Sequence, residues 1–291
     1  MGTGHWILGV CAVVVSGLAQ AQACDAPGWR AQRVDAVALG GRLYDNWWAA
    51  CGLAQPQGTH PSYPALGKQS GATTWRCKEC HGWDYRGKDG AYAKGSHATG
   101  IVGIAAYAGR EERAIVGILK DRTHRFDAVM PPALLQHIAR FVRDGQVDVS
   151  NRIDRETRQV SGRLAAGQRI YTRECMVCHG VAGRALDFSA TSGAPEYVGT
   201  VAADNPWEAL HKIRHGQPGA VMTDARLRAR AADPDAVASS RSPMGGHMGV
   251  HGGGPMAAHM IAGRAMPAMR QRLSLQQQLD LLRFLQSLPT R

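Results

Sequence analysis

The sequence lacks an apolar run long enough to cross a membrane. Residues 6–19 are apolar, but a spanning helix needs roughly 20 such residues. The run is followed by "QAQA" at residues 20–23, a pattern typical of signal peptidase sites. We therefore predict a signal peptide at residues 1–23 and a periplasmic mature protein, although no Lys or Arg precedes the run. A retained anchor or lipidation of Cys24 are the alternatives that would attach the chain to a membrane.

The sequence also lacks motifs that name a substrate. It contains no nucleophile beside a base, no paired-carboxylate motif and no glycine-rich nucleotide loop. Lys and Arg outnumber Asp and Glu by 34 to 23, but the basic residues are scattered, which argues against nucleic-acid binding. This excess of positive charge favours partners with acidic surfaces.

Cysteine is scarce, and most of it is concentrated in one repeated pattern. The chain has seven cysteines, of which four form two C-x-x-C-H units at residues 77–81 and 175–179. Cys11 lies in the predicted signal peptide, which leaves Cys24 and Cys51 as a possible disulfide in an oxidising compartment or as two unrelated thiols. A zinc site would need both cysteine pairs to converge, and it would leave the repeated histidines without a role.

Both units resemble the covalent haem-attachment sites of c-type cytochromes. In that family two cysteines hold the haem and the adjacent imidazole is the proximal ligand of the iron. The cofactors implied are two c-type haems. The resemblance implies attachment through Cys77, Cys80, Cys175 and Cys178, with His81 and His179 as proximal ligands.

The second half of the chain has the clearer helix pattern. Residues 162–175 have the apolar spacing of an amphipathic helix, and residues 273–285 have that of another, with Ser274 as its N-cap. In class I cytochromes c the first and last helices cross over a glycine and aromatic residues. The resemblance therefore implies that Gly167 and Tyr171 lie against Phe284.

The first half repeats these parts with an insertion. Residues 40–44 match the opening helix and residues 134–142 the closing helix. Between them, residues 45–74 are rich in Pro, Gly and Thr, which predicts an ordered loop rather than a helix. A polar stretch from Asp144 to Ser161 is expected to link the two copies.

The expected fold class is all-α, with two tandem cytochrome c-like helical domains that each wrap around one haem. The domains are expected at residues 24–148 and 149–291. The second carries an insertion at residues 223–265, in which methionines and histidines alternate with glycines. Such ligands suit Cu(I), so copper binding is one interpretation, and a mobile surface loop is the interpretation we favour.

The sixth ligand of the iron in this family comes from a loop ahead of the closing helix. In the second half we favour Met222, which follows the stretch Gly-Gln-Pro-Gly at residues 216–219, and Met266, which is followed by proline, is the alternative. In the first half His124 lies 17 residues before Phe141, close to the 18 that separate Met266 from Phe284, whereas Met130 lies only 11 before it. We therefore predict His124, with Met130 as the alternative.

Four further side chains are considered as possible neighbours of the first haem. His60 and His97 are weaker candidates for the iron, and Trp83 and Tyr85 are expected to pack beside the haem or simply to be buried aromatics.

The function that these patterns favour is that of a periplasmic di-haem electron carrier. Its two haems would differ in potential, because a thioether ligand raises the potential and a second imidazole lowers it. Its partners would be redox proteins with acidic docking surfaces. The alternative is a di-haem enzyme, similar to peroxidases or sulfur-compound dehydrogenases, that acts on a small molecule at a haem with an open sixth position.

Overall fold

The computed structural model of the chain describes residues 35–189, 194–218 and 266–290. Within these ranges the protein is helical, and its only β-type pairings are the isolated bridges Gly87–Val102 and Ile153–Val160. The predicted all-α class is therefore confirmed. A search of the same ranges found no helix with the length and apolar character that membrane crossing requires.

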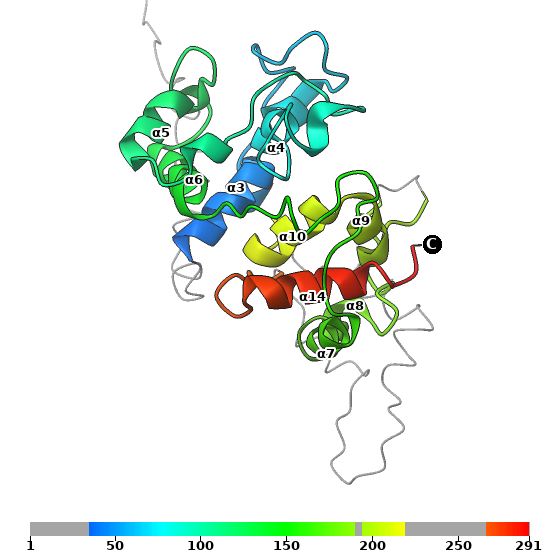
Figure 1. The fold of residues 1–291 in the computed structure, drawn as a ribbon. Helices are drawn as coiled ribbons and strands as arrows, with labels where there is room; N and C mark the ends of the chain where they lie inside the picture. The colour runs from blue at the N-terminus through cyan, green and yellow to red at the C-terminus, as the bar shows by residue number, and fades with distance from the viewer. Residues whose placement is uncertain (1–34, 190–193, 219–265, 291) are drawn as a thin grey trace, which may run out of the picture.

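The helices follow the chain in two groups (Figure 1). The first group consists of α3 (Ala36–Cys51), η1 (Gly71–Trp75), α4 (Cys77–His81), η2 (Ala91–Ala93), η3 (Ala105–Tyr107), α5 (Glu112–Leu119), η4 (Phe126–Ala128) and α6 (Pro132–Asp144). The second group consists of α7 (Leu164–Glu174), α8 (Met176–His179), α9 (Val198–Asp204), α10 (Pro206–His215) and α14 (Leu275–Leu285).

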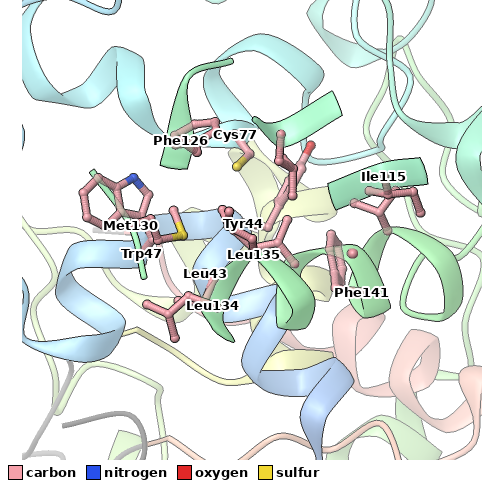
Figure 2. Packing of buried hydrophobic residues seen from close by; sticks show 14 of the residues in the cluster. Leu43, Tyr44, Trp47, Cys77, Ile115, Phe126, Met130, Leu134, Leu135 and Phe141 are labelled. Atoms are coloured by element: carbon pink, nitrogen blue, oxygen red, sulfur yellow. The ribbon is translucent and has the colours of Figure 1, made fainter. Parts of the chain in front are cut away.

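The first group is built on the crossing of α3 and α6. The two helices approach so closely at Gly40 that a Cβ atom there would lie 2.0 Å from the carbonyl oxygen of His137. Beside this contact the rings of Tyr44 and Phe141 lie 5.0 Å apart. Figure 2 shows these two rings among the buried residues of the core, together with Leu43 and Leu135.

The second group repeats this crossing with α7 and α14. A Cβ atom at Gly167 would lie 1.9 Å from the carbonyl oxygen of Asp280, and the rings of Tyr171 and Phe284 lie 5.2 Å apart. Ser274 caps α14, because its hydroxyl accepts a hydrogen bond from the backbone N–H of Gln277. The contacts expected of Gly167, Tyr171 and Phe284 are confirmed.

The predicted loop at residues 45–74 is wrong at both ends. Helix α3 continues to Cys51, and residues 71–75 form the 3₁₀ helix η1. The helical geometry of α3 breaks at Asn46 (φ −156°, ψ 91°), whose side-chain oxygen then accepts the N–H of Ala49 and starts a new helical turn. Trp47 is buried in the core, and this burial outweighs its modest helix propensity.

The predicted polar linker is in part a structural element of the second group. Val149, Ile153 and Val160 are buried in the same core as α7 and α14, and the Ile153–Val160 bridge closes the segment on itself. Most of the polar side chains of this stretch are exposed, so its polar composition did not reveal the three buried apolar residues.

Helix α10 lies between α3 and α14, as Figure 1 shows. Its His211 donates from Nε2 to the carbonyl of Gly41 (2.8 Å) and accepts at Nδ1 from the hydroxyl of Tyr85 (2.9 Å). One helix turn on, the backbone carbonyl of His215 accepts a hydrogen bond from the guanidinium of Arg42 (2.8 Å). These buried bonds tie the two groups of helices together.

Candidate functional site

The first C-x-x-C-H unit forms the single-turn helix α4 (Cys77–His81). This helix ends at Gly82, whose left-handed backbone (φ 76°) favours glycine. The carbonyl of Gly82 accepts a hydrogen bond from the buried hydroxyl of Tyr44 (2.6 Å), so α3 sets the position of the unit. Tyr44 was expected only as part of an opening helix, and its hydrogen bond to the motif was not predicted.

The two thiols of this unit are unlike those of a redox-active dithiol. Burial raises the pKa of both Cys77 and Cys80 to about 12, whereas reactive C-x-x-C thiols have lowered pKa values. No disulfide joins the two. A role in thiol–disulfide exchange is therefore disfavoured.

The imidazole of His81 is held in an orientation suited to metal binding. Its Nδ1–H donates to the carbonyl of Val102 (2.8 Å), which leaves Nε2 as the unprotonated nitrogen. Burial lowers the pKa of His81 to about 4, so the ring is neutral at physiological pH. A backbone carbonyl on the second nitrogen is the usual arrangement behind a ligating histidine.

A cavity of about 340 Å³ opens beside α4. Its walls are mainly apolar, and the polar residues His60, Arg76, Thr74 and Ser62 lie around it. Such a cavity is large enough for a cofactor-sized ligand. Its lining includes Cys77, Cys80 and His81 from the motif and His124 from the segment before η4. These residues fit the haem that the resemblance implies, because two thiols and two imidazoles line one cavity.

His124 faces His81 across this cavity. The two ring centroids lie 6.2 Å apart and their planes differ by 22°. The Nδ1–H of His124 donates to the carboxylate of Asp121 (3.1 Å), which also accepts the backbone N–H of His124 (2.8 Å). As with His81, the Nε2 of His124 is the nitrogen left for a ligand. Neither Asp121 nor the carbonyl of Val102 was predicted from the sequence, because each acts through a contact that spacing does not reveal.

Met130 and His97 lie elsewhere. Met130 is 3% exposed and packs in the core beside Trp47 and Leu134, as Figure 2 shows. It is not one of the cavity-lining residues. His97 donates to the carboxylate of Glu79 (2.9 Å), and its ring stacks on Tyr92 at 4.8 Å.

Trp83 and Tyr85 extend from the first unit toward the second group of helices. Trp83 is buried in the core that contains α7 and α14, with its ring 5.0 Å from that of His211. Tyr85 packs against Tyr44 and donates to His211. Both therefore contribute to the join between the groups.

The second C-x-x-C-H unit is positioned in the same way as the first. Cys175 follows α7, and α8 (Met176–His179) ends at Gly180 (φ 77°), whose carbonyl accepts from the hydroxyl of Tyr171 (2.5 Å). Burial raises the pKa of Cys175 to about 12. The hydroxyl of Tyr171 thus repeats the contact that Tyr44 makes to Gly82.

Several predicted residues lie outside the part of the chain that the structure describes. These are the signal peptide at residues 1–23, Cys24, Met222 and the insertion at residues 223–265. Met266 is described and half-buried, and its backbone carbonyl lies 3.5 Å from the guanidinium of Arg42.

Two further expectations concern the remaining cysteines and copper. Cys51 is disulfide-bonded, and its partner lies outside the described residues, so its pairing with Cys24 stays a prediction. Among the described residues no group of three or more His, Cys, Asp or Glu side chains is placed to hold a metal ion. The copper interpretation rests on the insertion alone.

The chain was compared with family models, curated proteins and solved structures. Residues 164–289 match the family model described as Cytochrome c, a range that begins with α7 and includes the second C-x-x-C-H unit. No curated protein and no solved structure matches the chain. The match supports placing the protein among the c-type cytochromes, as a haem-based electron-transfer protein with covalently bound haem c.

Proposed function

We propose that the chain is a periplasmic di-haem c-type cytochrome that transfers electrons between redox partners. Haem c supplies an iron that cycles between the ferrous and ferric states. In the first half Cys77 and Cys80 would hold the haem and His81 would be its proximal ligand. In the second half the corresponding residues are Cys175, Cys178 and His179.

The observation that supports a second haem is that the same contacts are made within each half of the chain. In both halves a tyrosine hydroxyl donates to the carbonyl of the glycine that directly follows the C-x-x-C-H unit, Tyr44 to Gly82 and Tyr171 to Gly180. The crossings at Gly40 and Gly167 are equally close. Because the second half matches the Cytochrome c model, the same contacts in the first half support a second domain of the same kind.

The facing imidazoles support His124 as the sixth ligand of the first iron. Both imidazoles line the cavity, and each uses its Nδ1 in a hydrogen bond to the protein. The observed separation of the ring centroids is 6.2 Å. Met130, the alternative, is packed away from the cavity in the core.

Different ligands would give the two haems different potentials. A His/His pair lowers the potential relative to a His/Met pair, and Met222 or Met266 would supply the thioether in the second half. Electrons would then tend to pass from the first haem to the second. The net charge of +11 would steer the protein toward partners with acidic surfaces.

The periplasmic location is supported by the signal-like N-terminus and by the disulfide at Cys51, since structural disulfides persist in oxidising compartments.

Near-infrared magnetic circular dichroism of the oxidised holoprotein tests the ligand assignment. We expect one bis-histidine signal and one histidine–methionine signal, with the bis-histidine signal lost in His124→Ala. Met130→Leu is the matched control, because it keeps the core volume and should retain both signals. A wild-type protein with a high-spin haem, or a Met130→Leu variant that loses a signal, would refute the assignment.

A further inference from the structure

The loop at residues 53–70 is anchored to the segment that precedes Cys77. Trp75 donates from its indole N–H to the carbonyl of Gly58 (3.1 Å). The backbone N–H of Gly71 donates to the hydroxyl of Thr59 (2.9 Å), and the backbone N–H of His60 donates to the hydroxyl of Thr74 (2.8 Å). The loop is therefore tied to the attachment side of the cavity.

The same loop also holds the opposite side of the cavity, where His124 lies. The Nδ1 of His60 accepts the backbone N–H of Ser62 (3.1 Å), which fixes the proton on Nε2. That Nε2–H donates to the carbonyl of His124 (3.0 Å). The hydroxyl of Ser62 donates to the carbonyl of Thr123 (2.7 Å). The carbonyls of the residue before His124 and of His124 itself are thus both held by the loop.

His60 is well supported in this position. It is 8% exposed although most of its loop is exposed. Its ring packs against Trp75 at 4.4 Å and against Phe126 at 5.9 Å. An imidazole packed on two aromatic rings has little freedom to turn, so its hydrogen bond to His124 has a fixed direction.

The segment that carries His124 needs an external support. Arg125, the next residue, has a left-handed backbone (φ 55°, ψ 25°), a conformation that costs free energy for any residue with a Cβ atom. Such strain persists only where the surroundings hold it. The hydrogen bonds from His60 and Ser62 are contacts from outside the segment that can do so.

We propose that the loop at residues 53–70 is a latch that keeps His124 on the iron of the first haem. His60 is a positioning residue: it acts on the iron only through the peptide of His124. Weakening the latch lets His124 swing away and opens the sixth position to a small external ligand. This inference rests on the proposed function, because it requires His124 to be the sixth ligand. The second half has no equivalent loop, since only three residues separate Tyr171 from Cys175.

Cyanide binding to the oxidised holoprotein, followed by stopped-flow absorbance, tests the latch with a pair of variants. In His60→Gln the amide nitrogen replaces Nε2 and keeps the donor to His124. In His60→Asn the amide replaces Nδ1 and that donor is lost. We expect His60→Asn to bind cyanide about tenfold faster than the wild type, and His60→Gln to stay within about twofold of it.

Two controls separate positioning from general damage. His97→Asn removes another imidazole of the same half that does not touch the His124 segment, and it should bind cyanide at the wild-type rate. Ser62→Ala removes one hydroxyl and should increase the rate about threefold, which tests the latch even if His60→Asn folds poorly. The bis-histidine signal should remain in His60→Asn and in Ser62→Ala, because His124 itself is intact in both variants.

Combining His60→Asn with His124→Ala completes the test. Without His124 the latch has nothing to hold, so the double variant should bind cyanide at the rate of His124→Ala alone. An equal acceleration in both backgrounds, or no acceleration in either, would overturn the latch. If the wild type itself lacked a bis-histidine signal, the ligand assignment would fail instead, and the two failures are therefore distinguishable.

Discussion

Replacing Gly167 by alanine tests the helix crossing on which the second half is built. The new Cβ would lie 1.9 Å from the carbonyl oxygen of Asp280 and 2.8 Å from the Cβ of Phe284, whereas real contacts of this kind are 3.0 Å or longer. Helices α7 and α14 would therefore have to separate by about 1 Å in an interior that packs like a crystal. The backbone oxygen of Asp280 cannot rotate away, so the clash is not relieved by a rotamer change.

The expected loss of stability follows from two opposing contributions. Overpacking of a close interface costs about 1–3 kcal/mol. Alanine in place of glycine gains about 1 kcal/mol of helix propensity. Because the obstacle here is backbone, we expect the overpacking to be at the upper end and the net loss to be about 2 kcal/mol.

Denaturant unfolding of the oxidised holoprotein, followed by far-ultraviolet circular dichroism, measures this loss. Gly117→Ala is the matched control, because Gly117 lies in α5 and its Cβ would meet nothing within 4 Å. It should gain up to about 1 kcal/mol. Gly40→Ala, whose Cβ would lie 2.0 Å from the carbonyl oxygen of His137, should behave like Gly167→Ala. A Gly167→Ala variant as stable as Gly117→Ala would refute the close crossing.

Two further predictions concern the join between the halves. Burial lowers the pKa of His211 from 6.5 to about 4. The unfolded state therefore binds the extra proton between these pH values, and the free energy of unfolding should fall by about 2 kcal/mol from pH 7 to pH 5. His215, whose pKa burial lowers well below its usual value, adds to the same trend. His211→Gln should remove the contribution of His211 from this pH profile of denaturant unfolding, and a flat wild-type profile would contradict the buried neutral imidazole. Tyr85→Phe leaves the Nδ1 of His211 without its donor and should lower the free energy of unfolding by about 1–3 kcal/mol in the same assay. The control Tyr107→Phe, at a more exposed tyrosine, should change it by less than about 0.5 kcal/mol. Equal effects of the two substitutions would show that the Tyr85 hydroxyl contributes nothing.

Local sequence patterns were sufficient to predict the opening and closing helices of the second half. The apolar spacing before Cys175 and after Ser274 predicted α7 and α14, since a helix that must bury one face leaves a regular mark in the sequence. The close contact of Gly167 with Phe284 followed from the family resemblance. The predicted loop at residues 45–74 was wrong at its start, because the Pro-, Gly- and Thr-rich composition of the segment does not indicate the new helical turn that Asn46 starts after the kink in α3.

The sequence by itself determined the chemistry of this protein, because two C-x-x-C-H units place their thiols and imidazole within one helical turn whatever surrounds them. The tertiary structure alone decided which distant side chains meet that chemistry. His124 and His81 line the same cavity although 43 residues separate them in the chain, and the side chain of Met130 packs instead in the core that contains Trp47. The bonds of His211 to Gly41 and Tyr85 likewise join residues more than a hundred positions apart. Such contacts depend on how helices pack, which no local spacing encodes.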